Sequence, residues 1–336
     1  MTISGLVDSS TLPMTIKPML AHLTREPFDS PDHIFELKWD GIRTLAFIED
    51  GKLRLQTRTL RDVTSQFPEL HELPRSVKAD QAVLDGELVC FDKEGHPSFQ
   101  LMSRRLHRQE AGQTVHRPRA HYVAFDILYA DGRSVMDEPL MLRKQLLQYV
   151  LDSSDVAQPS EFIENDGKAF FKATCDHSLE GIMAKEKSSA YYPGKRSPSW
   201  HKVKRVRECE FVVGGYAFGG RRKEMFGSLL LGLYDRNQRL VFVGQVNNGF
   251  TAAEAKRIHS VLQSLHTDAS PFESEPQLQK FVFWCRPEIV CRVEYGEFTM
   301  DGKLRYPVYV TQREDKSPSE CKIDHSPGWP SALPVG

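Results

Sequence analysis

Long apolar runs are absent from this sequence of 336 residues. A membrane-spanning helix needs roughly 18 or more consecutive apolar residues, and no segment approaches that length. The first twenty residues, MTISGLVDSSTLPMTIKPML, also lack the basic start and the apolar core of a secretory signal. We therefore expect a cytoplasmic protein that does not associate with membranes.

Paired cysteines and a glycine-rich phosphate loop are missing as well. The six cysteines, at positions 90, 175, 209, 285, 291 and 321, contain no C-x-x-C pair. This spacing builds neither a zinc knuckle nor a dense disulfide framework, so we expect reduced thiols. Because no G-x-x-x-x-G-K-[ST] loop is present, any nucleotide phosphate would have to be held by side chains and metal.

An excess of charge of one sign is also lacking, because 44 Lys and Arg residues face 45 Asp and Glu residues and leave a net charge of -1. Bulk charge therefore does not indicate a protein that coats nucleic acid. Basic residues gather locally instead. Residues 195–207 contain six Lys or Arg and no acid, with Trp200 among them, and Arg104 and Arg105 form a second cluster. A solvated surface is the ordinary explanation of any single cluster, and contact with a DNA backbone is the functional one.

Composition and strand pattern predict an α+β protein of two domains. Hydrophobic residues make up 40% of the chain and charged residues 26%, which is the balance of a globular protein, and the length suits two domains. In the first part of the chain, β-rich runs alternate with helical patterns. The runs cover residues 34–38, 44–49, 53–57, 82–91 and 121–128, and the main helical pattern covers 138–151.

After residue 207 the pattern changes to strands separated by Gly-rich turns. We expect strands at residues 211–217, 228–234, 240–246 and 289–298, with one helix at 252–265. This arrangement is typical of a small Greek-key barrel of the OB type, although an SH3-like barrel would give a similar pattern. The predicted domains are residues 1–206 and 207–336, and the second ends in a loosely ordered tail after Ser317.

The segment FELKWDGIR, residues 35–43, carries the candidate chemistry of the first domain. As a strand it would turn Glu36 and Lys38 to one face and its apolar residues to the other, since side chains alternate. An amine held over an apolar layer becomes a nucleophile when cationic neighbours or desolvation lower its pKa. Arg43 adds a charged fork suited to phosphate or ribose. The pattern K-x-D-G-x-R alone has roughly five chances in a thousand of arising in a chain of this composition.

Further segments supply the other parts that a nucleotidyl transfer needs. Residues 84–88, LDGEL, and 180–185, EGIMAK, bring carboxylates suited to a divalent cation. Phe125 offers an aromatic plane for a base, and residues 200–204, WHKVK, set two amines on one strand face for phosphate oxygens. Each part alone has an ordinary explanation, such as core packing for Phe125. Their coincidence in one chain indicates a nucleotide site.

These segments resemble the ordered motifs of ATP-dependent DNA ligases in the covalent nucleotidyltransferase superfamily, most closely the ligase domain of bacterial end-joining ligases. The resemblance begins at PMLA, residues 18–21, and ends at RYPVYVTQREDK, residues 305–316, and it covers about nine tenths of the chain. It implies a nucleotidyltransferase domain of antiparallel, ATP-grasp-like sheets with helices, followed by an OB-fold domain.

The resemblance also implies a role for each matching residue. Lys38 would attack the α-phosphate of ATP and become adenylylated. Arg313, Asp315 and Lys316 would orient the departing pyrophosphate. The residues implied to contact ATP or AMP are Glu36, Arg43, Arg58, Glu87, Phe125, Lys202, Lys204, Arg313 and Lys316. The implied ligands of Mg²⁺ or Mn²⁺ are Glu87 and Glu180, and the candidates for DNA contact are Arg58, Arg104, Arg105, Lys195 and Arg196.

The implied reaction joins 3'-hydroxyl and 5'-phosphate ends of nicked or broken duplex DNA, through a lysine-AMP intermediate and a DNA-adenylate. ATP is the co-substrate, and DNA repair is the expected setting. We expect a monomer, associated with the nucleoid when on DNA, with a Ku-type end-binding protein as a candidate partner. The chain is either a minimal enzyme or one module of a larger one.

Other activities stay open on the residues alone. A GTP-using capping enzyme shares the lysine strand and the barrel, but EGIMAK and the final Arg-x-Asp-Lys favour a ligase. An RNA ligase would differ in its contacts to a 2'-hydroxyl, which sequence does not reveal. A non-catalytic OB module would bind nucleic acid without covalent AMP and would leave Lys38 without a purpose. An NAD-dependent ligase is disfavoured, because about 30 residues precede the lysine strand and zinc-binding cysteine pairs are absent.

Overall fold

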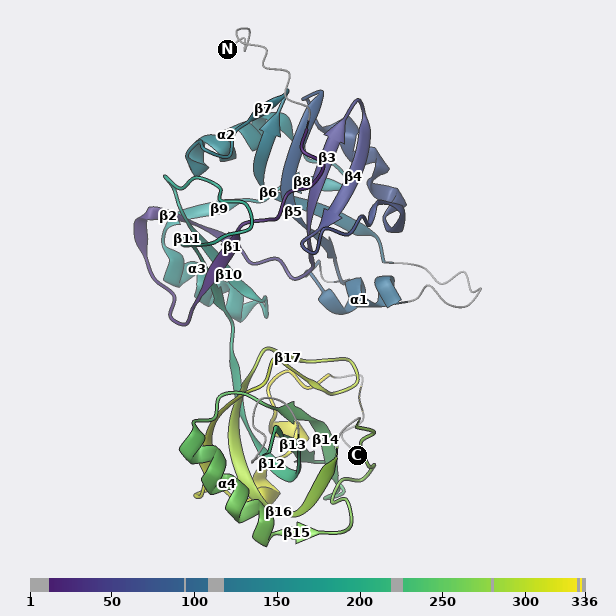
Figure 1. Cartoon of the computed structure of the whole chain (residues 1–336), viewed down its shortest axis with the longest axis vertical. Coiled ribbons are helices and arrows are strands. Elements are labelled where there is room, and N and C mark those ends of the chain that lie inside the picture. Colours follow the sequence, from purple (N-terminus) through teal and green to yellow (C-terminus); the bar gives the residue numbers. More distant parts are fainter. Residues whose placement is uncertain are drawn as a thin grey trace. The chain divides into compact units, whose positions relative to one another are not determined.

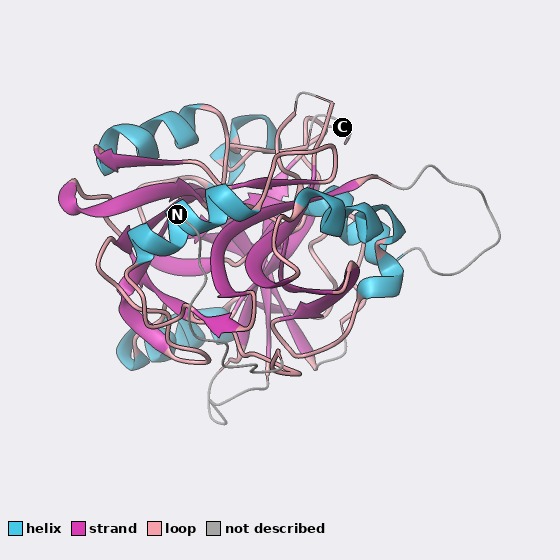
Figure 2. Cartoon of the chain, turned by 90° about the horizontal axis from the view of Figure 1, so that it is seen from above, coloured by secondary structure: helices cyan, strands magenta, loops and turns pink. Residues whose placement is uncertain are grey.

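The computed structural model describes residues 12–93, 95–107, 118–218, 226–278, 281–330 and 333. The chain divides into two compact units, Met1–Arg205 and Val206–Gly336, called unit 1 and unit 2 below (Figure 1). Strands predominate over helices in the described part of the chain (Figure 2), and the predicted α+β class is confirmed. No helix in this part is long and apolar enough to cross a membrane.

Unit 1 contains a large sheet that holds most of the predicted strands. Its order is β4-β3-β5-β6-β7, and β8 pairs parallel to β6. Both faces of the sheet are covered, since Ala46 and Ile48 of β3 enter one core and Leu45 and Phe47 enter another. The strand bounds are Ile42–Glu49 for β3, Lys52–Thr57 for β4, Gln81–Cys90 for β5, Ala120–Ala130 for β6, Arg133–Ser134 for β7 and Ala157–Pro159 for β8.

A second sheet of unit 1 has the order β1-β11-β10-β2-β9. Its strands are Leu20–Thr24 for β1, Ser30–Leu37 for β2, Phe162–Asn165 for β9, Gly181–Glu186 for β10 and Arg196–Lys204 for β11. Ala21 of β1 and Trp200 of β11 share a core with Leu45 and Phe47 of the large sheet. The two sheets of unit 1 are therefore packed against each other through one apolar cluster.

Helices cover the outer faces of unit 1. The helix predicted at residues 138–151 is α2, Leu140–Val150, which begins after Pro139 and lies against β6 (Figure 1). The helix α3, Gly167–Asp176, packs on β2 and β10. Shorter elements are α1, Phe99–His107, and the 3-10 helices η1, Thr64–Gln66, and η2, Pro68–Ser76.

The main sheet of unit 2 has the order β14-β13-β12-β16-β15, and β19 also pairs with β16, while β17 and β18 pair in a separate two-stranded sheet. The predicted strands at residues 228–234 and 240–246 coincide with β13, Ser228–Tyr234, and β14, Leu240–Val246. The helix α4, Ala252–Ser264, starts at a capping box formed by Thr251 and Glu254. The remaining strands are β12, Arg207–Ala217, β15, His266–Thr267, β16, Val282–Tyr295, β17, Glu297–Phe298, β18, Leu304–Arg305, and β19, Val308–Arg313.

The segment 317–330, predicted to be a loose tail, packs on unit 2 instead. Two short 3-10 helices, η3 at Pro318–Glu320 and η4 at Ile323–His325, form part of it. Cys321 and Ile323 are buried, and the hydroxyl of Tyr295 donates to the carbonyl of Pro327 at 2.7 Å. The prolines and serines of the segment suggested disorder, but the burial of Cys321 and Ile323 docks it on the core of unit 2.

All six cysteines are free thiols, as the spacing predicts. Four of them, Cys90, Cys285, Cys291 and Cys321, are buried. Burial raises the pKa of Cys90 to about 11 and the pKa values of Cys285 and Cys321 to about 12. These thiols act as small apolar side chains in the two cores.

The turn between β2 and β3 requires glycine at position 41. A Cβ atom there would lie 2.0 Å from the backbone carbonyl oxygen of Leu88, which cannot move aside. We expect Gly41→Ala to lower the free energy of unfolding by more than ~1 kcal/mol, measured by calorimetry. Gly296→Ala is the matched control, because its nearest new contacts would lie at 3.6 Å, and it should leave the melting temperature almost unchanged. An unchanged melting temperature in Gly41→Ala would contradict this account of the turn.

Candidate active site

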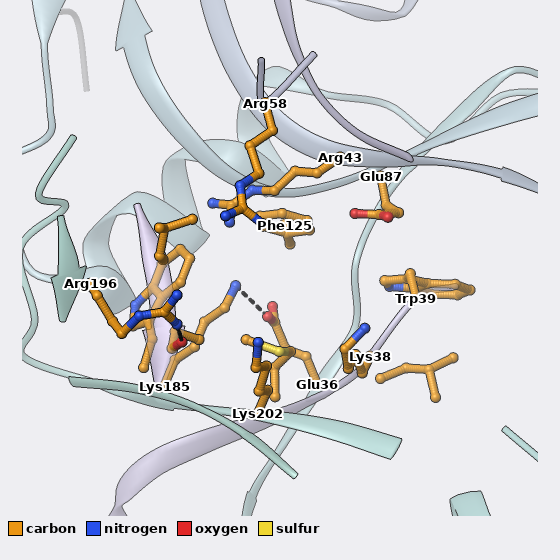
Figure 3. A pocket seen from close by; sticks show the side chains of 15 residues that line it. Glu36, Lys38, Trp39, Arg43, Arg58, Glu87, Phe125, Lys185, Arg196 and Lys202 are labelled. Atoms are coloured by element: carbon orange, nitrogen blue, oxygen red, sulfur yellow. Dashed lines mark hydrogen bonds and ion pairs between the residues drawn. The ribbon is translucent and has the colours of Figure 1, made fainter. Parts of the chain in front are cut away.

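A pocket in unit 1 is lined by both of its sheets (Figure 3). Eight of its lining residues are charged and three are aromatic. The lining residues are Leu20, Ala21, Glu36, Leu37, Lys38, Trp39, Arg43, Arg58, Glu87, Phe125, Met183, Lys185, Arg196, Trp200 and Lys202. Seven of the residues predicted to contact nucleotide are among them: Glu36, Lys38, Arg43, Arg58, Glu87, Phe125 and Lys202.

Lys38 lies just beyond the end of β2 and is fixed at both its backbone and its side chain. Its backbone N–H donates to the carbonyl of Gly181 at 2.9 Å, which ties it to the start of β10. Its ammonium forms an ion pair with the carboxylate of Glu180, and the other oxygen of Glu180 lies 3.1 Å from Lys204 Nζ. Glu180 therefore holds two of the predicted phosphate-side lysines in one bridge.

Glu87 of β5 lies opposite Arg43 of β3 and faces the same pocket. Desolvation raises the pKa of Glu87 to about 8, although the charges of Lys38 and Arg43 act in the opposite direction. The charge of Glu180 also raises this pKa, so the two carboxylates sense each other. Two acids and one amine thus meet at the position where Lys38 would react.

Phe125 owes its position to a β-bulge. In the pairing of β5 with β6, Asp126 lies opposite Asp85 and Ala124 lies opposite Gly86, which leaves Phe125 as the extra residue. Bulges re-aim side chains in this way beside functional sites. The ring of Phe125 meets Trp200 edge-on at 6.5 Å, and Lys185 Nζ lies 4.4 Å and 4.3 Å from the two ring centroids. The pocket therefore ends in an aromatic wall with a cation against it.

Arg43 is oriented by a buried acid. Its Nε and Nη2 donate to the two carboxylate oxygens of Asp85 at 3.0 Å and 2.6 Å, and the hydroxyl of Tyr191 donates to Asp85 at 2.7 Å. Asp85 is fully buried and fully engaged by these partners. It serves to hold Arg43, whereas the sequence had presented it beside Glu87 as a carboxylate for a cation.

Several more lysines and arginines lie close together near Lys202. Lys202 and Lys204 share one face of β11, on either side of the buried Val203. Desolvation lowers the pKa of Lys202, and so do the charges of Lys204, Arg196, Lys38 and Arg58. Because only nearby like charges act in this way, these five cations occupy one region. A polyphosphate anion is the ligand that such a region favours.

The comparisons with known proteins agree with this geometry. Residues 18–204 match the ATP dependent DNA ligase domain, and residues 222–316 match the ATP dependent DNA ligase C terminal region. The chain belongs to the ATP-dependent DNA ligase family. The resemblance found in the sequence is thereby confirmed.

Curated relatives of the chain include end-joining proteins. It is 36% identical to the multifunctional non-homologous end joining DNA repair protein LigD of Mycobacterium tuberculosis over 309 residues, 91% of this chain but 39% of that protein. It is 35% identical to LigD of Pseudomonas aeruginosa over 95% of this chain and 38% of that protein. It is also 31% identical to the DNA ligase of Thermococcus fumicolans, of which it covers 57%. The chain thus spans about two fifths of the LigD proteins that it matches.

Solved structures show the same architecture. The mycobacterial DNA ligase D complexed with ATP and MES is 34% identical, with a TM-score of 0.54 over 91% of this chain and 97% of that one. The ligase domain of Mycobacterium tuberculosis LigD gives 34% identity and a TM-score of 0.52 with the same coverage. The predicted fold, a nucleotidyltransferase domain followed by an OB-fold domain, is confirmed.

Glu87 and Glu180 are the residues that could hold a divalent cation. The described residues include no group of three or more His, Cys, Asp or Glu side chains suited to a metal ion. Two carboxylates nevertheless fit Mg²⁺, which commonly takes one or two protein carboxylates and completes its shell with substrate phosphates and water. The raised pKa of Glu87 fits as well, since a cation bound beside it would supply the charge that stabilises the carboxylate.

Arg313 and Lys316 belong to unit 2, where both contact Glu210 of β12. Arg313 Nη1 lies 2.7 Å from Glu210 and also forms a two-fold contact with Asp315 at 2.8 Å, while Lys316 Nζ lies 3.6 Å from Glu210. The charged residues of the last motif are therefore engaged with acids of their own unit.

The structure places the residues predicted to contact DNA in different environments. Arg58 and Arg196 line the pocket, and Lys195 is exposed. The prediction that Arg105 contacts DNA does not fit the structure, because its guanidinium is buried. It donates to Glu69 at 2.8 Å and to the carbonyls of Gln66 and Pro118, and so it anchors α1. Local charge density in the sequence could not distinguish such a buried cation from a surface one. Arg104 lies in α1, and its side chain is outside the described part of the structure.

Some pocket residues were not predicted from the sequence. Lys185 and Met183 lie two residues apart on β10 and both reach the pocket, a spacing of two that the segment EGIMAK already contained. Trp39 was read only as part of an apolar face, but it lines the pocket and its indole donates to Ser160 Oγ at 3.1 Å. That contact joins residues 121 positions apart, and nothing local predicts it.

Two substitutions of different expected size test the hydrogen bonds that Asp85 forms with Arg43 and Tyr191. Asp85→Asn should lower the free energy of unfolding by about 3 kcal/mol, because it leaves the partly buried Arg43 without its counter-charge. Tyr191→Phe removes one hydrogen bond and should lower it by about 1 kcal/mol. Urea denaturation followed by fluorescence would measure both. Equal effects of the two substitutions would contradict the assignment of Asp85 as the anchor of Arg43.

Proposed function

We propose that this chain joins the 3'-hydroxyl and 5'-phosphate ends of broken strands in duplex DNA, using ATP. The observation that carries the proposal is the ion pair of Lys38 with Glu180, within a pocket that also presents an aromatic wall and a concentration of cations. A nucleophilic amine, acids for a divalent cation and a platform for a base are the components of nucleotidyl transfer.

In the first step, Lys38 Nζ attacks the α-phosphate of ATP, and pyrophosphate leaves as the phosphoramidate bond forms. Lys38 must first lose a proton, and the Glu180 carboxylate is the acid group in contact with it. Lys202 and Lys204 hold the α-phosphate, and the adenine lies against Phe125. A divalent cation held by Glu87 and Glu180 would neutralise charge on the phosphoryl oxygens and favour the neutral amine.

In the two later steps, AMP passes from Lys38 to the 5'-phosphate of the DNA, and the neighbouring 3'-hydroxyl then attacks that phosphate with loss of AMP. Transfer of AMP converts a poor leaving group into a good one. Arg43 and Arg58 suit the ribose or the 5'-phosphate, because both guanidinium groups line the pocket that contains Lys38.

The wider setting is proposed from the relatives. Residues 1–206 would form the adenylyltransferase domain and residues 207–336 the OB domain. LigD of Mycobacterium tuberculosis is described as a multifunctional non-homologous end joining DNA repair protein, and this favours double-strand break repair for the present chain. We propose that it acts as a monomer in the cytoplasm, joins the nucleoid when on DNA, and works with a Ku-type end-binding protein.

Labelling with ATP tests the first step. Incubation with α-labelled ATP and Mg²⁺ or Mn²⁺ should give a label that survives a denaturing gel, and Lys38→Ala should abolish it. Lys172→Ala, which changes an exposed lysine of α3, is the matched control and should label like the unchanged protein. Label from GTP instead of ATP would point to a capping-type enzyme, and no label from either would sink the proposal. A nicked duplex with DNA or RNA at the break then separates DNA from RNA joining.

Binding to nicked DNA should weaken steeply with salt. Each phosphate contact that is lost should reduce the slope of log K against log[salt] by about 0.9, and we expect such a loss in Lys195→Ala. Arg105→Met should leave the slope unchanged, because the Arg105 guanidinium is bound inside unit 1. Affinities measured by fluorescence anisotropy over several salt concentrations would show this. A flat salt dependence in the unchanged protein would contradict binding through its basic surface.

A further inference from the structure

Glu36 is a buried carboxylate held between two lysines at the inner end of the pocket. It is 1% exposed, and it lines the pocket together with Lys185. Lys185 Nζ lies 2.5 Å from its Oε2, and Lys144 Nζ forms an ion pair with its Oε1 (Figure 3 shows the Lys185 contact). Each oxygen of this buried carboxylate is therefore engaged by one lysine.

Lys144 reaches Glu36 from outside the pocket. It belongs to α2, is 2% exposed and is absent from the pocket wall. Its neighbour Arg143 is fully buried and makes a two-fold contact with Asp126 at 2.8 Å and 2.9 Å, so α2 is anchored at the residue that follows Phe125. One short stretch of α2 therefore fixes both Glu36 and the strand that presents the aromatic wall.

The hydrogen-bonding character of a carboxylate decides which edge of a base it can pair with. An ionised carboxylate is an acceptor only, whereas a protonated one carries an O–H donor. Adenine presents a 6-amino donor, and guanine presents a 6-carbonyl acceptor at the same place. With a lysine paired to each of its oxygens, the Glu36 carboxylate is placed to accept from the amino group of adenine and not to donate to the carbonyl of guanine.

We infer that Lys144 is a positioning residue that fixes the carboxylate of Glu36 in place, and that it thereby sets the preference for adenine over guanine nucleotides. The inference rests on the proposed function, since it assumes that a nucleotide occupies this pocket. Lys144 does not touch the nucleotide and acts only through Glu36. Lys185 cannot replace it, because Lys185 engages the opposite oxygen and lies against the rings of Phe125 and Trp200.

The test compares label transfer from ATP and from GTP in Lys144→Met, a substitution that keeps the length of the side chain and removes its charge. We expect the ratio of kcat/KM for ATP to kcat/KM for GTP to fall at least about tenfold, mainly through a higher KM for ATP, because a charged hydrogen bond to Glu36 is lost. Glu36 keeps Lys185 as a partner in this variant, so the fold should persist.

Two further variants separate this role from a structural one. Arg105→Met removes a buried cation of the same unit from its carboxylate Glu69, and it should lower the melting temperature without changing the ATP to GTP ratio. Glu36→Gln should itself lower the ratio. Adding Lys144→Met to Glu36→Gln should then change the ratio by less than about twofold, because the two substitutions remove one shared interaction.

The outcomes are distinct. A ratio that is unchanged in Lys144→Met, in a protein whose unchanged form labels from ATP, would overturn the inference and leave the proposed function intact. A full additional loss when Lys144→Met is combined with Glu36→Gln would also overturn it, since Lys144 would then act by another route. Absence of labelling in the unchanged protein would remove the proposed function and the inference together.

Discussion

The pocket of unit 1 holds many positive charges close together. Their mutual repulsion has to be offset by nearby negative charge if the pocket is to keep its shape. Its wall and rim carry Lys38, Lys185, Lys202, Arg43, Arg58 and Arg196. The fold meets this constraint with individual acids. Glu180 bridges Lys38 and Lys204, Asp85 holds Arg43, and Glu36 holds Lys185. In the described part of the chain, Arg58, Arg196 and Lys202 form no such ion pair with an acid, so an anionic ligand in the pocket would supply the negative charge beside them.

Strand pairing provides the precision that this charge arrangement needs. β2 and β10 are antiparallel neighbours, so the end of the strand that leads to Lys38 lies beside the start of the strand that follows Glu180. β3 and β5 place Arg43 opposite Glu87 in the same way. Because both sheets of unit 1 are joined by one apolar cluster, groups distant in sequence converge at fixed separations.

The sequence predicts much of this arrangement where the signal is local. Alternating or continuous apolar runs gave β13 and β14 with correct bounds, and the K-x-D-G-x-R pattern drew attention to Lys38. Contacts across long sequence separations were not predictable in the same way. The bulge that exposes Phe125 depends on the pairing register of β5 and β6, and the pair of Glu36 with Lys144 joins residues 108 positions apart. Arg105 was misread because burial of a cation depends on partners that the chain brings to it only on folding.

Burial of the cysteine thiols limits their oxidation and alkylation. The pKa values of about 11 for Cys90 and about 12 for Cys285 and Cys321 leave roughly one thiolate in ten thousand or fewer at neutral pH. Peroxides and alkylating agents react with the thiolate, so these sulfur atoms are poor targets even before burial restricts access. Cys90, Cys285 and Cys321 should therefore stay reduced and unmodified under conditions that oxidise or alkylate exposed, acidic thiols.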